Sequence, residues 1–142
     1  MSRADMQLLG RDLTSLSVAL ATGGIGSVEL VGQVLAAVEA SQAPLNAYIS
    51  VDAEGALAAA ARSDAQRRRG AARRRGGLPI AVKDNIDVAG MVSTAGMETR
   101  RHAPPATLDN PAVAALRAAG AVIVGKLNMH EAALGADNDN PH

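Results

Sequence analysis

Apolar positions in the first half of the chain recur at helical spacing and are separated by glycine, proline and short polar segments. A first helix is expected from about Asp12 to Ala21, where it meets the glycine pair at residues 23–24. A second helix is expected to be N-capped by Ser27 and to end at Pro44, since proline cannot continue the helical hydrogen-bond pattern. This part of the chain is therefore expected to form a helical layer.

A short strand and a third helix follow in the same half. The segment NAYIS, residues 46–50, is expected to be a short strand. Asp52 is then expected to cap an alanine-rich helix that continues to about Arg69. Residues 1–75 are accordingly predicted to be mainly helical.

After residue 75 the pattern changes to short apolar runs of strand length. LPIAV, residues 78–82, and AVIVGKL, residues 121–127, have the continuous apolar character of buried strands. MVSTAG, residues 91–96, is a further short strand candidate. Residues 76–142 are therefore predicted to begin an α/β core.

A helix is expected between these strands. Asp109 is predicted to cap it, with Pro111 near its first turn and Gly120 at its end. Strand, helix and strand in this order indicate a parallel pair joined by a right-handed crossover. NMHEAALG, residues 128–135, is expected to form a short helix or turn. The fold class is thus α/β: an N-terminal helical layer, followed by the start of a mixed sheet with packed helices.

The C-terminal stretch GADNDNPH, residues 135–142, is polar and is followed by no further element. Too few strands precede it for a full sheet. Residues 1–142 are therefore expected to be the N-terminal part of a single domain that is truncated at its C-terminus.

Composition narrows the function classes. Of the 142 residues 48% are apolar, which is enough for a core, but Tyr48 is the only aromatic residue. A nucleic-acid platform that stacks bases on aromatic rings is therefore not expected. Acidic and basic residues balance at 14 each, so no net field steers the chain toward nucleic acid or an anionic membrane. The absence of cysteine rules out disulfides, thiolate metal sites and a cysteine nucleophile.

The first twelve residues, MSRADMQLLGRD, lack the continuous apolar region of a secretory signal. No apolar run approaches the length of a membrane-spanning helix. A cytoplasmic protein without a membrane partner is expected.

Three local patterns suggest nucleic-acid, nucleotide or zinc binding, but each lacks residues that such binding requires. The arginine runs QRRRG, residues 66–70, and ARRRGG, residues 72–77, have no accompanying recognition motif, and the first falls at a helix C-terminus, where cations are favourable. GAVIVGK, residues 120–126, has phosphate-loop spacing, but Leu127 replaces the Ser or Thr that would bind magnesium. His130–Glu131 begins a zinc motif that Leu134 does not complete. No metal and no cofactor are expected.

Lys83 is the residue that composition alone does not explain. It directly follows the apolar run at residues 78–82, at the carboxyl end of a predicted strand, where open α/β folds place ligands. If the side chain is partly desolvated there, a neutral amine becomes available as a base for a hydroxyl nucleophile. The alternative is a structural lysine at a strand end. Ser93 and Thr94 could return near Lys83, although hydroxyls on a strand or turn are the simpler interpretation.

The strings around Lys83 resemble the amidase signature family. GLPIAVKDNIDVAG at residues 77–90, STAG at 93–96 and AALRAAGAVIVGKLNMHEAALG at 114–135 occur in the order typical of that family. The resemblance implies an incomplete amidase signature fold and an activity that hydrolyses a carboxylic amide to an acid plus ammonia or an amine. Its substrate would be a small-molecule amide, without nucleic acid as a partner.

The resemblance also implies site roles. Lys83 occupies the position of the base in a Ser–cis-Ser–Lys triad, which acts through an acyl-serine intermediate. Asp84 and Asn85 belong to the same string and would orient the lysine, with turn formation as an equal alternative. Asn128 and Met129, with Glu131, match the family's N-M-x-E segment near the catalytic region.

Both family serines are missing from residues 1–142, because no Gly-Ser-Ser-Gly string occurs in them. These residues alone are therefore expected to be an inactive fragment. Two alternatives stay open. One is the amidase subunit of a tRNA-dependent amidotransferase, with glutaminase activity and partner subunits. The other is a non-catalytic protein, either an inert remnant or a module that forms a homodimer.

Overall fold

The computed structural model describes residues 8–71, 75–135, 140 and 142. In chain order the elements are α2 (Leu13–Ala21), α3 (Ser27–Leu45), β1 (Tyr48–Val51), α4 (Ala53–Arg68), β2 (Pro79–Lys83), the 3₁₀ helix η1 (Glu98–Arg100), α5 (Pro111–Ala118), β3 (Val122–Leu127) and the 3₁₀ helix η2 (Glu131–Ala133). Within this described part, a three-stranded sheet has the order β1-β3-β2, with β2 parallel and β1 antiparallel to β3. The predicted α/β class with a mixed sheet is confirmed.

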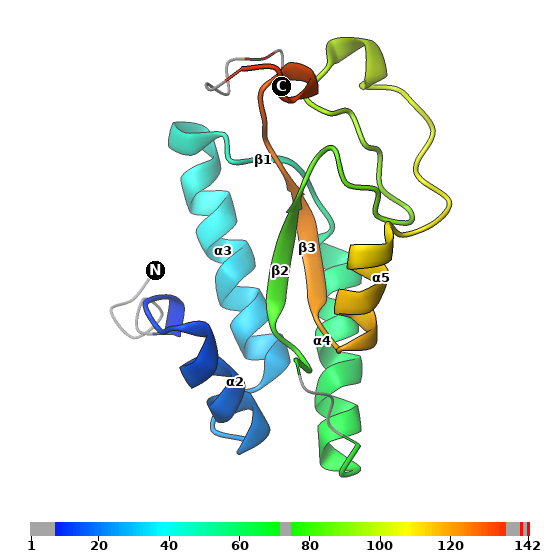
Figure 1. The fold of residues 1–142 in the computed structure, drawn as a ribbon. Coiled ribbons are helices and arrows are strands. Elements are labelled where there is room, and N and C mark those ends of the chain that lie inside the picture. Colours follow the sequence, from blue (N-terminus) through cyan, green and yellow to red (C-terminus); the bar gives the residue numbers. More distant parts are fainter. Residues whose placement is uncertain (1–7, 72–74, 136–139, 141) are drawn as a thin grey trace.

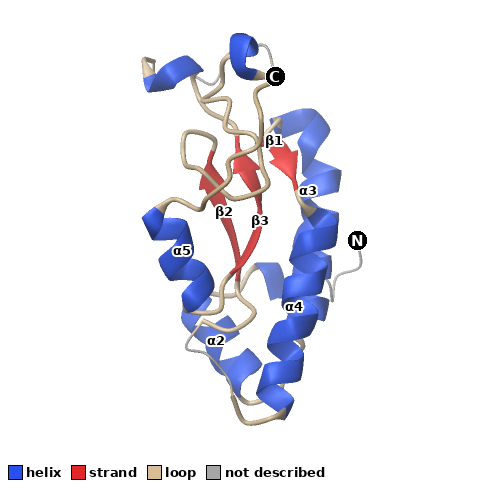
Figure 2. Ribbon diagram, turned by 90° about the vertical axis from the view of Figure 1, so that its right-hand side faces the viewer, coloured by secondary structure: helices blue, strands red, loops and turns tan. Residues whose placement is uncertain are grey.

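Helices cover both faces of the sheet (Figure 1 and Figure 2). On one face α3 and α4 pack against β3, and on the other α5 packs against β2 and β3. The first core cluster contains small residues of α4 that let this helix approach the sheet closely; its members are Val31, Ala56, Ala60, Val122 and Val124. A core without large aromatic rings is thus built from close helix–sheet contacts.

The β2–α5–β3 unit brings together the two strand ends at which the candidate site lies. Val82, Val113 and Ile123 lie in one cluster, in which α5 packs against both strands. Because β2 and β3 are parallel, their carboxyl ends lie at the same edge of the sheet. The loops after both strands gather above this edge in Figure 1.

Several predicted helix ends agree with the structure. Asp12 and Asp52 cap α2 and α4 by accepting the N–H groups of Ser15 and Gly55. Pro44, however, lies inside the last turn of α3, and the helix ends one residue later at Leu45. The end is set by Asn46, whose left-handed backbone (φ 44°) turns the chain while its N–H bonds Gln42 O.

Other predicted boundaries were wrong. Asn110, not Asp109, caps α5 by accepting the N–H of Ala112. Asp109 instead accepts the N–H of Ala89 at 2.8 Å and pairs with Arg117 at 3.0 Å. Residues 91–96 form an irregular loop rather than a strand, because their polar groups bind side chains of the candidate site.

Asp64 joins α3, α4 and the chain entering β2. Ser27 is the first residue of α3 rather than its cap, and Gly26 before it offers no side chain. The Asp64 carboxylate accepts the N–H groups of Ser27 at 2.8 Å and Val28 at 3.1 Å, and it pairs with Arg67 at 2.6 Å. The helix is thus capped from a neighbouring helix, and Arg67 continues the link by donating to Gly76 O.

This cap makes stability depend on pH. Burial raises the pKa of the Asp64 carboxyl, but the N–H groups of Ser27 and Val28 and the Arg67 guanidinium outweigh burial and hold that pKa below 3.8. A lowered folded-state pKa stabilises the fold above the unfolded-state value, and this contribution is lost as the pH falls through the folded-state value. We expect Asp64→Asn to lower the free energy of unfolding at pH 7 by about 1–2 kcal/mol.

Urea unfolding of the complete protein at pH 7 and pH 3 measures the effect. The difference between wild type and Asp64→Asn should shrink at pH 3, because the Asp64 carboxyl of the unfolded state, with its ordinary pKa of 3.8, is then protonated. Glu39→Gln, at an exposed position of α3, is the matched control and should change little at either pH. An equal difference at both pH values would contradict the assignment.

The remaining expectations concern charge and membrane contact. No helix in the described part of the chain is both long and apolar enough to cross a bilayer. Arg67 of the first arginine run is engaged by Asp64, whereas Arg73 and Arg74 of the second run lie outside the described residues. Most of the polar stretch at 135–142 lies outside them as well.

Candidate functional site

Both lysines of the chain lie at the carboxyl ends of the two parallel strands. The sequence has twelve arginines and two lysines, Lys83 in β2 and Lys126 in β3. Their neighbours in the register are Leu127 for Lys83 and Val82 for Lys126. Because side chains alternate along a strand, the two amines leave the sheet on opposite faces.

Lys83 is exposed in this structure, which differs from the predicted partial burial. It is the last residue of β2 and follows the buried Val82. Its Nζ donates to the main-chain oxygen of Asn128 at 2.8 Å. The amine is therefore directed across the sheet edge toward the chain that leaves β3.

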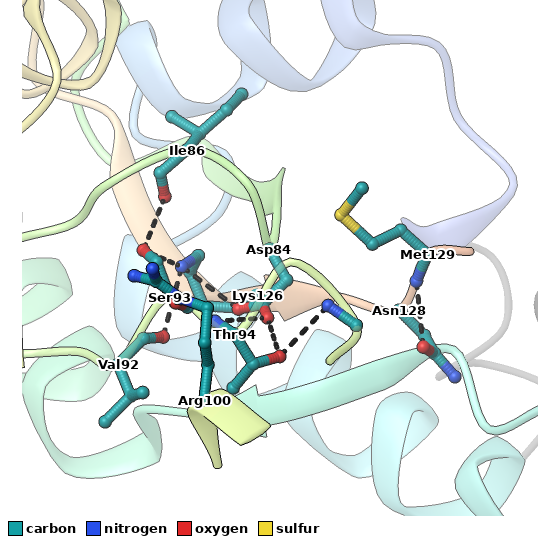
Figure 3. A network of polar contacts seen from close by, with 10 residues as sticks. Asp84, Ile86, Val92, Ser93, Thr94, Arg100, Lys126, Asn128 and Met129 are labelled. Atoms are coloured by element: carbon teal, nitrogen blue, oxygen red, sulfur yellow. Dashed lines mark hydrogen bonds and ion pairs between the residues drawn. The ribbon is translucent and has the colours of Figure 1, made fainter. Parts of the chain in front are cut away.

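Asp84 follows Lys83 directly and is fully buried. One carboxylate oxygen, Oδ2, accepts the N–H of Thr94 at 2.8 Å and also its hydroxyl. The other, Oδ1, lies 3.1 Å from Lys126 Nζ. Asp84 thus connects the end of β2 to the loop of residues 91–96 and to β3 (Figure 3).

Lys126 is the other half of this buried ion pair and has no exposed surface. Besides Asp84, its Nζ contacts Ser93 Oγ at 2.9 Å and Val92 O at 3.2 Å. Residues 122–127 form a strand, as predicted for AVIVGKL, rather than the loop that a phosphate cradle requires. The residue was missed as a site residue; the available signal was a cation inside an otherwise apolar strand.

The loop at 91–96 packs tightly on the segment after β3. Gly96 has φ 73°, and a Cβ at this position would lie 2.6 Å from Met129 O. Ala95 O accepts the N–H of Ala132 at 2.8 Å. The two loops that follow β2 and β3 are therefore in direct contact, and a side chain at residue 96 would force them apart.

Asn128, the first residue after β3, connects several segments at the carboxyl end of the sheet. Its Oδ1 accepts the N–H of Met129 at 2.8 Å and an Asn140 Nδ2 donor at 2.6 Å, while its Nδ2 donates to Asn46 O at 2.9 Å. Asn140 Nδ2 also reaches Met129 O at 2.6 Å. This clamp holds Asn140 against Asn128, whose main-chain oxygen accepts the hydrogen bond from Lys83 Nζ.

The structure brings together four of the five predicted site residues: Lys83, Asp84, Asn128 and Met129. Met129 is buried and contributes its main chain to the clamp. Asn85 lies exposed in the turn closed by the hydrogen bond from Ile86 N to Lys83 O. The hydroxyls of Ser93 and Thr94 are engaged by Lys126 and Asp84.

A family model described as Amidase matches residues 29–142. The chain belongs to this amidase family. A Mycobacterium tuberculosis (strain ATCC 25618 / H37Rv) protein that carries the amidase name AmiA2 is 48% identical over 119 residues, which are 84% of this chain and 24% of that protein. A glutamyl-tRNA(Gln) amidotransferase subunit of Anaeromyxobacter sp. (strain K) is 41% identical over 142 residues, 99% of this chain and 28% of the relative.

Solved structures of amidases share the fold. The native peptide amidase of Stenotrophomonas maltophilia aligns with a TM-score of 0.80 and 32% identity, over 92% of this chain and 27% of that structure. The 142-residue amidase chain spans about a quarter of the length of the relatives it matches.

Proposed function

We propose that the complete protein hydrolyses a carboxylic amide, with Lys83 as the base of a Ser–cis-Ser–Lys triad. The observation that carries this proposal is the Lys83 amine at the carboxyl edge of β2 and β3, in a chain of the amidase family. Under this proposal the paired serines lie in a segment beyond residues 1–142, since those residues contain no Gly-Ser-Ser-Gly string.

The contact to Asn128 gives the Lys83 amine a defined direction at the sheet edge. A neutral amine that donates one N–H to Asn128 O keeps its lone pair free to accept a proton from a serine hydroxyl. That bridging serine would in turn take the proton of the nucleophilic serine. Lys83 is thus proposed to start a proton relay at the sheet edge.

The reaction then proceeds in two balanced steps. The nucleophilic serine oxygen bonds the amide carbon, the C–N bond breaks, and the relayed proton leaves with the nitrogen as ammonia or an amine. Water next attacks the acyl-serine and gives its proton back through the same relay, which releases the acid and restores the serine. Backbone N–H groups near the nucleophile would stabilise the oxyanion.

Ammonia release and serine labelling test the proposal together. The complete protein should release ammonia from simple primary carboxamides and should be modified at one serine by an organophosphonate, with loss of activity. Residues 1–142 alone should show neither behaviour. Amide turnover that survives full serine modification would overturn the acyl-serine mechanism.

A second candidate is a glutaminase that works within an amidotransferase complex. The 41% identity to a glutamyl-tRNA(Gln) amidotransferase subunit over 142 residues favours it. Glutamine should then be the preferred amide, and turnover should rise when the partner subunits are added. Turnover of small amides that no added subunit changes supports the independent amidase instead.

A further inference from the structure

We infer that Asp84, Lys126 and Thr94 form a positioning unit for Lys83; this inference rests on the proposed function. None of the three needs to contact substrate. Their role is to fix the end of β2 so that the Lys83 amine is held in one direction.

The unit fixes the residue after Lys83 through both its side chain and its main chain. The Asp84 carboxylate is held by Thr94 on one oxygen and by Lys126 on the other. Its main-chain N–H donates to Leu127 O at 3.1 Å, and its main-chain oxygen accepts the N–H of Ala95 at 3.3 Å. Asp84 therefore has little freedom to rotate, and the backbone of Lys83 is restrained with it.

Stability alone does not explain an ion pair in this place. Both side chains are completely buried, and removing two charges from water costs about as much as their attraction returns. Val82, the register partner of Lys126 in the sheet, lies in an apolar cluster with Val88 and Ile123. The ion pair and the hydrogen bonds of Asp84 and Lys126 have fixed directions, so they hold the end of β2 in one conformation. A base that removes a proton from a serine hydroxyl needs such a fixed position.

Thr94 gives the mildest test of the unit. Thr94→Val keeps the shape and the main-chain N–H but removes the hydroxyl that binds Asp84, whereas Thr94→Ser keeps the hydroxyl. In the complete protein, Thr94→Val should lower kcat by about tenfold or more with KM changed less than about twofold, and Thr94→Ser should restore most of kcat. Asp84→Asn, which removes the charge facing Lys126, should behave like Thr94→Val.

Ser27→Ala is the matched control. It also removes a buried hydroxyl, which donates to Gly77 O at 2.9 Å near the opposite, amino end of β2. It should lower the melting temperature without a change in kcat. Wild-type kcat in both Thr94→Val and Asp84→Asn would overturn the inference.

Lys83→Ala separates this inference from the proposed function. If Lys83→Ala keeps its activity, the proposed function fails. If Lys83→Ala is inactive while Thr94→Val and Asp84→Asn are both fully active, only the positioning unit fails. Because Thr94 is inferred to act through Lys83, Thr94→Val should have no further effect on the residual turnover of Lys83→Ala.

Discussion

Replacement of Lys83 by alanine is expected to lower amide turnover by about three orders of magnitude or more while the fold persists. Loss of a general base and of its relay removes the step that generates the serine alkoxide. Within the described residues the side chain is exposed and donates to Asn128 O, so its removal should cost about 1 kcal/mol of stability or less. Steady-state ammonia release and a thermal melt of the complete protein measure both effects.

Two further variants sharpen this result. Lys83→Arg keeps a cation but cannot supply a neutral amine, so it should be as inactive as Lys83→Ala. Arg62→Ala removes an exposed cation from α4, outside the site, and should retain wild-type turnover. Activity of Lys83→Arg within tenfold of wild type would mean that Lys83 supplies charge rather than a base.

Local signals predicted most of the fold. Asp12 and Asp52 marked helix starts, and the apolar runs before Lys83 and after Gly120 marked two strands, of which β3 is buried and β2 is partly buried. These features depend on neighbours within a few residues, which a single sequence displays. The parallel strand pair joined through α5 followed from the order of elements.

The wrong predictions concern segments whose conformation depends on contacts with residues distant in the sequence. Asp109 and Asn110 are both good N-caps, and the choice depends on Ala89 and Arg117, which engage Asp109. MVSTAG has the residue types of a strand, yet Thr94 binds Asp84 and so holds the segment in a loop. Tertiary hydrogen bonds therefore override local preference at the site.

Which of the two lysines is buried was not predicted from the sequence either. Both follow apolar runs, and only the structure shows that Lys126 is the buried one. What distinguishes them is the carboxylate of Asp84, which faces Lys126 and not Lys83. A buried lysine requires such a partner, and that partner comes from another strand end.

Removal of the buried amine should have the largest effect on stability. Lys126→Met in the complete protein is expected to lower the free energy of unfolding by about 3–5 kcal/mol, because Asp84 is left buried with an unpaired charge. Urea unfolding measures the loss. Glu98→Gln breaks the exposed ion pair with Arg101, 2.9 Å apart, and should cost about 1 kcal/mol or less.

A double-mutant cycle then measures the interaction free energy between Asp84 and Lys126. In Asp84→Asn/Lys126→Met no charge remains buried without a partner, so the double variant should be more stable than the sum of the single losses predicts. We expect a coupling free energy of about 2 kcal/mol, within the range for contacting residues. Additive losses would show that Asp84 and Lys126 are stabilised independently. Turnover should not recover with stability in the double variant, because the charged contacts that fix the residue after Lys83 are gone.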